Sequence, residues 1–171
     1  GVAYWYLASL WGNVIIYENT SSMVNNYVVP TNPRADAMEF AIRDMEYAAK
    51  YLPSVSSAAG RVNKYSAYGM LSRFYLSMAG ITTDGQYDGK NVATDFNRGT
   101  RNTYYLDLAR KAAEKVISAS SFKLMGSYGD LFKIANNNCS EDMFQLQWLA
   151  GSTDAIGWGC NQDITAFFGW S

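Results

Sequence analysis

"GRVNKYSAYGMLSRFYLSMAG", residues 60–80, is the stretch that decides the fold. After Lys64, its sixteen residues include many large apolar side chains and almost no charge. On a helix, the polar residues Ser66, Arg73 and Ser77 fall on one narrow strip, because they are seven and four positions apart. A helix that is apolar over most of its circumference is buried on several sides. We therefore predict an inner helix from about Lys64 to Ala79 that is enclosed by other helices.

The same stretch is a poor candidate for a membrane span. A span needs about 20 consecutive and mainly apolar residues, and this one is shorter and is interrupted by an arginine and several serines. Within the predicted helix, Tyr65, Tyr68 and Tyr75 are three and seven positions apart. Tyrosines at this spacing are typical of the core at a helix crossing, and we prefer that role to a ligand platform.

Composition excludes several classes of function. The 171 residues are enough to bury a core without a metal or a disulfide. With 14 basic and 15 acidic residues, the net charge of −1 does not suit binding to a nucleic-acid backbone. The chain has no histidine, which removes Ser-His-Asp and Cys-His catalytic pairs and the commonest zinc ligand. The side chains left for catalysis are carboxylates, Tyr and Lys, and we predict no cofactor and no metal site.

The two cysteines and the ends of the chain give little information about function. Cys139 and Cys160 are 21 positions apart, which fits no zinc or redox motif, and the sequence leaves open whether they pair. The opening, "GVAYWYLASLWG", has no initiator Met, basic region or cleavage site, so no targeting segment is visible. That opening is typical of the interior of a helix, and we expect the chain to be an excerpt of a longer protein.

A first helical hairpin is predicted around the decisive stretch. Residues 34–52 alternate apolar and charged positions with the period of a helix. Asn32 is the expected N-cap, Pro33 the first helical residue and Pro53 the stop signal. A short polar loop joins this helix to the one at Lys64. Two helices connected in this way form an antiparallel pair.

A second pair is predicted further along. Thr103 is expected to cap a helix that ends near Ala119, and residues 127–135 are expected to form its shorter partner helix. The inward face of the longer helix would carry Tyr105, Ala109, Ala112 and Val116. Residues 80–102 are polar and are predicted to be a long loop. The fold class is thus mainly α, made of antiparallel helical hairpins of a degenerate tetratricopeptide-like type, because the helix starts keep no fixed 34-residue period.

The residue pattern and composition change after the predicted helices. Residues 143–149, "MFQLQWL", alternate apolar and polar side chains and predict a short strand. The last 22 residues hold four glycines and four large aromatic residues, which predicts a long loop. We therefore divide this single domain into a helical scaffold, residues 1–142, and a strand with a long loop, residues 143–171.

Four stretches together carry a family resemblance. They are "YWYLASLWGNVII" (4–16), residues 60–80, "YYLDLARKAAEKVISASSFKLMGSYGDLF" (104–132) and "NNNCSEDMFQLQW" (136–148). In this order the chain resembles SusD/RagB-like proteins, which are outer-membrane glycan-binding lipoproteins of the starch-utilisation type. One departure is that Asn13 and Ile15 follow Trp11-Gly12 where the family usually has Asp and then Pro. The path of that turn is left open.

The resemblance has several implications. It implies a tetratricopeptide-like scaffold, no catalysis, and capture of an oligosaccharide at the surface of the outer membrane. It also implies a partner, a TonB-dependent SusC-like transporter. The family's lipid-bearing cysteine lies outside this chain, so neither Cys139 nor Cys160 is that anchor. The alternative function is a tetratricopeptide-type adaptor whose concave helical face binds a peptide.

The Gly- and Trp-rich tail contains the candidate ligand residues. A site for a sugar combines a flat aromatic surface with a few fixed polar groups. Trp158 and Trp170 offer the rings, and Asn161 and Asp163 offer the polar groups. The alternative reading is that these rings only hold a long loop against the helices.

Other polar groups favour structural roles. Glu141 and Asp142 are adjacent carboxylates on an extended chain, which point apart and cannot form the facing pair of a glycoside hydrolase. Arg61 is expected to hold neighbouring loop carbonyls or carboxylates. Residues 84–95 imitate a calcium loop only in part, so we leave calcium open there without predicting it.

Overall fold

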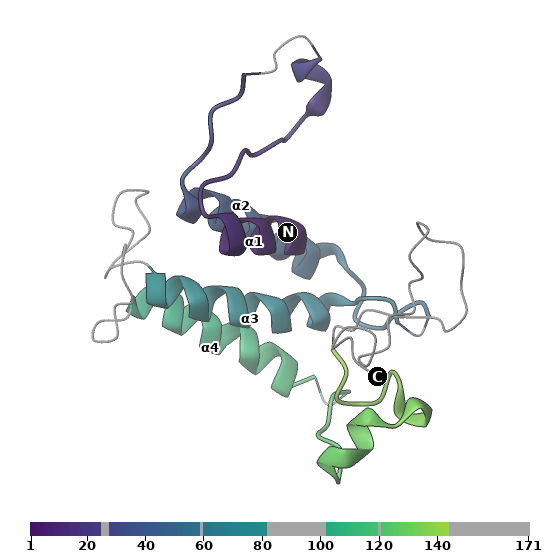
Figure 1. The fold of residues 1–171 in the computed structure, drawn as a ribbon. Coiled ribbons are helices and arrows are strands. Elements are labelled where there is room, and N and C mark those ends of the chain that lie inside the picture. Colours follow the sequence, from purple (N-terminus) through teal and green to yellow (C-terminus); the bar gives the residue numbers. More distant parts are fainter. Residues whose placement is uncertain (25–27, 59, 82–101, 120, 144–171) are drawn as a thin grey trace, which may run out of the picture.

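Four α-helices follow one another in a stack within the described part of the chain (Figure 1). The computed structural model describes residues 1–24, 28–58, 60–81, 102–119 and 121–143. The helices are α1 (Val2–Trp11), α2 (Arg34–Tyr51), α3 (Lys64–Ile81) and α4 (Thr103–Ile117). α1 packs on α2, α2 on α3, and α3 on α4. The mainly helical fold is confirmed, and α3 is an inner helix as predicted.

The core forms around α3. The largest fully buried apolar side chains are Phe74 and Met78 of α3 and Met38 and Ile42 of α2. Trp5 of α1 stacks on Phe74 with their ring planes at 5° and their centroids 3.9 Å apart. The predicted inward residues of α4 are all buried: Tyr105, Ala109, Ala112 and Val116. Burial of apolar surface on both sides of α3 therefore stabilises the stack.

The polar strip of α3 is more buried than its sequence predicts. Arg73 and Ser77 are exposed, but Ser66 is only 3% exposed because the loop before α3 and residues 141–143 lie over the first turns of the helix. Ser72 is also removed from solvent in part, and its hydroxyl donates to the carbonyl of Ala109 at 3.1 Å. Of the predicted polar strip, only Arg73 and Ser77 are open to solvent.

Two tyrosines, one on α3 and one on α4, bond to α2. The hydroxyl of Tyr75 donates to Glu46, and that of Tyr105 donates to Oε2 of Glu39 at 3.0 Å. Burial raises the pKa of Tyr75, and the hydrogen bond and negative charge of Glu46 raise it further. The predicted core role is confirmed for Tyr75, while Tyr65 and Tyr68 are half-buried.

The start of α2 is capped from an unexpected side. Asn32 does not cap the helix, because its backbone pairs with Val14 and its Oδ1 accepts from Ile16 N at 3.2 Å. Instead Asn13 Oδ1 accepts from Arg34 N at 3.0 Å across 21 residues of chain. Pro33 is the N-cap residue rather than the first helical one. The Asn13 turn, left open by the sequence, therefore leads to a contact that fixes α1 relative to α2.

The loop between α1 and α2 extends away from the stack (Figure 1). It holds a short 3₁₀ helix, η1 (Thr20–Met23), capped by Asn19. At the other end of α2, Leu52 is extended before Pro53, as the sequence predicts for a residue that precedes proline.

The start of α4 lies one residue earlier than predicted. Asn102, not Thr103, is the N-cap, and its Oδ1 accepts from Tyr104 N at 3.1 Å. Asn102 is fully buried, and its own N–H donates to Ala79 O at 3.0 Å. Asn is as good an N-cap as Thr. The error is small, but it makes Asn102 the residue that joins the end of α3 to the start of α4.

The predicted partner helix at residues 127–135 is wrong. The chain forms two short 3₁₀ helices there, η2 (Tyr128–Phe132) and η3 (Ile134–Asn136), and neither contains a buried residue. Tyr128, Phe132 and Ile134 are all exposed, so no packing of an apolar face supports a longer α-helix. α4 accordingly packs on α3, and the pair predicted for α4 with this segment is not formed.

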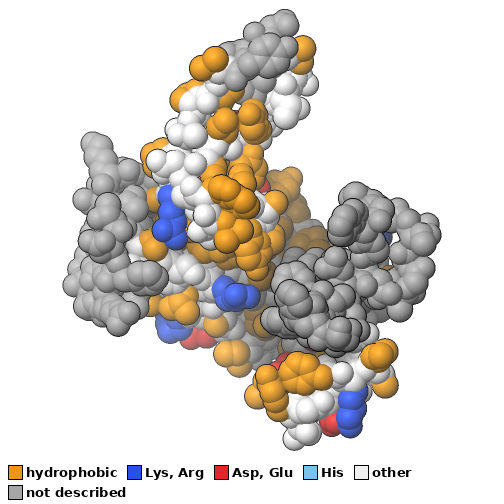
Figure 2. Space-filling view, in the orientation of Figure 1, with side chains coloured by type: hydrophobic (Ala, Val, Ile, Leu, Met, Phe, Trp, Pro, Cys, Tyr) orange, Lys and Arg blue, Asp and Glu red, His pale blue; other side chains and the backbone are white. Residues whose placement is uncertain are grey.

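The outward surface of α1 is apolar. Leu10 and Trp11 are 70% and 69% exposed, Tyr6 and Leu7 are exposed as well, and the helix has no charged residue. Figure 2 shows the hydrophobic side chains gathered over this part of the molecule. Among the described helices, none combines the length and apolar character needed to cross a bilayer.

Candidate functional site

The predicted ligand residues lie outside the described part of the chain. These are Trp158, Asn161, Asp163 and Trp170. The same holds for the predicted strand beyond Met143, for the calcium-like sequence at 84–95 and for Cys160, while Cys139 is a half-buried free thiol. In the described ranges, no three His, Cys, Asp or Glu side chains come together as a group that could hold a metal ion. The ligand residues stay predictions.

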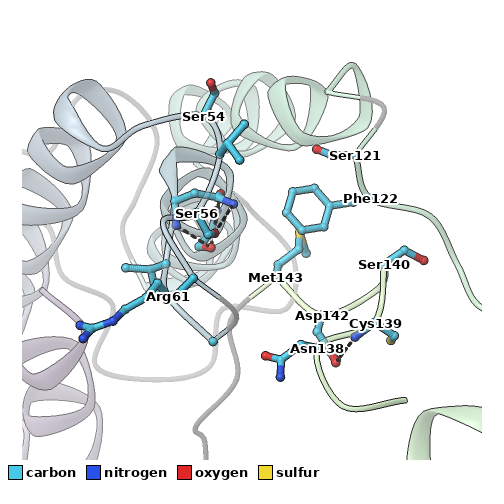
Figure 3. Close-up of a pocket in the computed structure, with 16 residues that line it drawn as sticks. Ser54, Ser56, Arg61, Ser121, Phe122, Asn138, Cys139, Ser140, Asp142 and Met143 are labelled. Atoms are coloured by element: carbon cyan, nitrogen blue, oxygen red, sulfur yellow. Dashed lines mark hydrogen bonds between the residues drawn. The ribbon is translucent and has the colours of Figure 1, made fainter. Parts of the chain in front are cut away.

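A cleft opens beside the first turn of α3, and we call it the Phe122 cleft (Figure 3). Its volume is about 470 Å³. Three stretches form its walls: the loop between α2 and α3, the chain just after α4, and residues 138–143. Its described lining residues are Ser54, Val55, Ser56, Ala58, Gly60, Arg61, Val62, Asn63, Ser66, Ser121, Phe122, Asn138, Cys139, Ser140, Asp142 and Met143.

Asn63 holds the first wall. Its Oδ1 accepts from the backbone N–H groups of Tyr65 and Ser66 at 2.9 and 3.1 Å, which caps α3. Its Nδ2 donates to Ser56 Oγ at 3.1 Å. The same side chain thus fixes both the start of the helix and the loop that faces the cleft.

Phe122 forms the second wall. Its ring meets Tyr65 of α3 edge to face, with the centroids 6.2 Å apart and the planes at 75°. Figure 3 shows the Phe122 ring beside Met143, with the serine-bearing loop across the cleft from it. Ser121 and Ser54 are exposed, and neither hydroxyl bonds to another described residue. The cleft therefore combines one aromatic ring with two serine hydroxyls that have no described partner.

Glu141 and Asp142 hold the third wall. Glu141 Oε2 accepts from Met125 N at 2.8 Å, and Asp142 Oδ2 accepts from Cys139 N at 3.1 Å. The two carboxylates therefore point at different backbone amides, as expected for a structural role at the entry to the following segment. Ser140 adds two bonds to Lys123: its Oγ donates to Lys123 O at 2.9 Å, and its O accepts from Lys123 N at 3.0 Å.

Arg61 departs from its predicted role. Its side chain is exposed, points away from the cleft in Figure 3, and has no partner among the described residues. Only its backbone is engaged, through a bond from Arg61 N to Ala58 O at 3.2 Å. Gly60, which precedes it, has a φ of +76°, a conformation that glycine adopts without strain. The turn, rather than the guanidinium, thus shapes this end of the loop.

A second cleft of about 640 Å³ lies on the other side of residues 141–143. It shares Ser66, Asp142 and Met143 with the Phe122 cleft. A Cβ on Gly69 would lie 3.3 Å from Sδ and Cε of Met143, so the missing side chain lets Met143 approach α3 closely. Tyr6 of α1 and Arg73 of α3 are exposed on its rim.

The chemistry of the Phe122 cleft suits a neutral, polar ligand. It offers serine hydroxyls, one aromatic ring and few free charges. Two of its important residues escaped prediction from sequence. The signal for Asn63 was present, because Asn directly before a helical pattern is an N-cap signature. No sequence signal pointed to Phe122, because only the fold brings it against α3.

The chain is similar to proteins of one kind. A SusD-like protein of Bacteroides ovatus is 37% identical over 147 residues, which are 86% of this chain and 24% of that protein. A crystal structure determined with xylogluco-oligosaccharide is 36% identical over 86% of this chain and 27% of its own, with a TM-score of 0.70. A SusD homologue from Bacteroides thetaiotaomicron is only 20% identical but has a TM-score of 0.69, over 91% of this chain and 28% of its own.

These matches confirm the SusD-like resemblance predicted from the sequence. The last of them shows the fold alone, because its identity is low. The chain spans about a quarter of the length of the curated relative that it matches. No family model matches the chain.

Proposed function

We propose that this chain, a segment of SusD-like type, contributes to a non-catalytic protein that binds oligosaccharides at the bacterial cell surface. The observation that carries the proposal is the 36% identity to a protein whose structure was determined with xylogluco-oligosaccharide, together with 37% identity to a SusD-like protein. The chain covers only about a quarter of those relatives, so the function is proposed for the whole protein that contains it.

The proposed ligand contacts are in the tail. Trp158 stacks on a sugar ring, with Trp170 as a second aromatic surface, and Asn161 and Asp163 bond to sugar hydroxyls. Gly157 and Gly159 flank Trp158, and neither has a side chain that could cover its ring. Aromatic rings bind the apolar C–H face of a sugar while amides and carboxylates match its hydroxyls.

Titration calorimetry of Trp158→Ala in the full-length protein tests this. Xylogluco-oligosaccharide is the first probe, followed by the best binder on a glycan array. Losing a stacked and desolvated ring should cost about 2 kcal/mol, or roughly thirtyfold in affinity. Trp11→Ala is the matched control, because Trp11 is an exposed tryptophan of α1 that has no part in the proposed contacts. Unchanged affinity for Trp158→Ala would remove its stacking role, and a collapsed melting temperature would show a structural one.

The protein is proposed to leave its ligand intact. Glu141 and Asp142 are each bonded to a backbone amide, which supports a structural rather than a catalytic role. Incubation with the bound oligosaccharide should release no shorter product. Product release that disappears in Glu141→Gln or Asp142→Asn would overturn this part of the proposal.

The proposed partner is a TonB-dependent SusC-like transporter that receives the oligosaccharide. The proposed location is the outer membrane, with a lipid anchor outside this chain. Both follow from the SusD-like type of the sequence. Affinity purification of the tagged full-length protein from outer membranes should recover the transporter. Recovery of the protein from the cytosol alone would contradict the location.

The alternative, a peptide-binding adaptor, has less support. An adaptor of tetratricopeptide type presents polar residues on its inner helices. The inner helix α3 instead buries Ser66 and engages Ser72 with the backbone of α4. No observation in the described residues favours a peptide over a sugar.

A further inference from the structure

We infer that the Phe122 cleft is an additional carbohydrate subsite, separate from the tail residues proposed above. The inference rests on the proposed function, because it takes the ligand to be an oligosaccharide. It uses only described residues, and the tryptophans of the tail play no part in it.

The first argument is the chemistry of the lining. Phe122 offers an aromatic surface, and Ser54 and Ser121 offer exposed hydroxyls that bond to no other described residue. A hydroxyl both donates and accepts, so it matches another hydroxyl in either orientation. A ring beside several short polar groups therefore favours a sugar over a purely apolar ligand.

The second argument is the small number of charges in the described lining. Arg61 lines the mouth but points away from the cleft (Figure 3). Asp142 keeps its negative charge although its Oδ2 accepts from Cys139 N, so the cleft disfavours an anionic ligand. A carboxylate oxygen is also an acceptor for a sugar hydroxyl. The lining therefore favours a hydroxyl-bearing ligand without negative charge.

The third argument is preorganisation. Tyr65 braces the ring of Phe122, Asn63 binds Ser56 of the facing loop, and Ser140 is bonded twice to Lys123. All three walls are thus fixed by contacts within the chain. A ligand would not have to order them, and this lowers the entropic cost of binding. The volume of about 470 Å³ lies within the usual range of small-molecule sites.

The test uses the full-length protein and two substitutions in one loop. Ser54→Trp places a large side chain in the cleft, whereas Ser57→Trp changes an exposed residue of the same loop outside the lining. Calorimetry with the best-binding oligosaccharide should show roughly a tenfold loss of affinity for Ser54→Trp, the size expected when an aromatic contact and its neighbours are blocked. Ser57→Trp should bind as the wild type does. Phe122→Ala should lose affinity to a similar degree.

A second measurement needs no substitution in the cleft. Cys139 lines the cleft as a free, half-buried thiol, so its alkylation rate reports on occupancy. Peptide mass spectrometry can follow labelling at Cys139 with and without saturating oligosaccharide. The ligand should slow labelling at least severalfold. This result does not depend on whether Ser54→Trp or Phe122→Ala folds.

The outcomes separate the two proposals. If wild-type protein binds no glycan on the array, the proposed function and this subsite both fail. If it binds, but Ser54→Trp keeps full affinity and Cys139 is labelled at an unchanged rate, the subsite is overturned and the proposed function stands. If Trp158→Ala and Ser54→Trp both lose affinity, both sets of contacts are supported.

Discussion

In α3 eight residues are buried, whereas η2 and η3 together bury none. The chain from 121 to 143 nevertheless follows a defined path. Its path is set by directed bonds, such as those of Ser140 with Lys123 and of Glu141 with the amide of Met125. Apolar burial is not directional and supplies most of the folding free energy, while single hydrogen bonds contribute little net free energy but fix geometry.

The Phe122 cleft lies between these two kinds of structure. Its floor is the first turn of α3, which belongs to the core, and its opposite wall is the hydrogen-bonded segment that ends at Met143. Changes in the core should therefore alter global stability. Changes in the segment should alter the shape of the cleft with a small effect on stability.

The largest expected effect is in the core. Leu71 is 2% exposed, and Leu71→Ala should destabilise the protein by about 2 to 5 kcal/mol through lost burial and the cavity it leaves. Leu76, on the same helix, is 58% exposed and serves as the matched control. Leu76→Ala should change the free energy of unfolding by about 0.5 kcal/mol or less. Chemical denaturation measures both.

If Leu71→Ala and Leu76→Ala lowered the free energy of unfolding equally, burial in α3 would not be what stabilises the stack. A change below about 0.5 kcal/mol for Leu71→Ala would mean that α3 lies at the surface, since buried Leu→Ala changes cost several times more. The full-length protein and the 171-residue chain should rank the two variants in the same order, because both leucines lie in the same helix.

The sequence predicts the part of the molecule that apolar burial stabilises. The apolar circumference of residues 64–79 predicts an inner helix, and the structure extends it only to Ile81. The prediction fails where apolar residues find no partner. Tyr128, Phe132 and Ile134 are apolar enough for a packed face but remain exposed, and the chain forms only the short 3₁₀ helices η2 and η3 there. Whether a face is covered depends on the tertiary contacts, which local periodicity does not contain.

Of the third wall of the cleft, only the divergence of the two carboxylates was predictable from the sequence. Adjacent Glu141 and Asp142 predict divergent carboxylates, and the structure places them on two different backbone amides. The cleft itself joins residues 54, 122 and 142, which are far apart in the sequence. Asn13 is a second example. Its Oδ1 accepts from Arg34 N, and this bond spans a loop whose course could not be predicted from the sequence. Non-local hydrogen bonds of this kind follow from the fold.

A smaller effect is expected at the hydrogen-bonded wall. Glu141→Ala removes the acceptor for Met125 N–H, but both residues are half-buried and water can replace the lost bond. The free energy of unfolding should fall by about 1 kcal/mol. Hydrogen exchange at the Met125 amide should speed up much more than exchange in α3, because the opening is local.

Glu141→Gln is the matched variant for this experiment. Its amide oxygen can still accept from Met125 N–H, so exchange there should stay closer to the wild-type rate. A global loss of stability as large as that of Leu71→Ala would show that the wall belongs to the same cooperative core. Slow exchange at Met125 in Glu141→Ala would show that another contact holds the segment.

The smallest effect is expected from charges that touch only other exposed side chains. Asp107 accepts from Lys111 Nζ at 2.6 Å and from Arg110 at 2.8 Å, all on the outward face of α4. Lys111 and, to a lesser degree, Arg110 hold the pKa of the Asp107 carboxyl below its ordinary value. A lowered folded-state pKa means that the contribution to stability is present above the ordinary pKa and is lost as pH falls through the lowered one.

Asp107→Asn should therefore lower the melting temperature slightly at pH 6, and this difference should shrink as pH falls through the lowered pKa of the wild-type carboxyl. Exposed ion pairs are weakened by salt, so molar sodium chloride should reduce the difference at pH 6 as well. Melting curves over a series of pH values from 6 downward, with and without salt, test this directly. If the difference did not shrink as pH falls, or if salt left it unchanged, Asp107 would act through a hydrogen bond to the fold, as Glu141 does. The contrast between buried or backbone-directed polar contacts and exposed ion pairs would then fail at this residue.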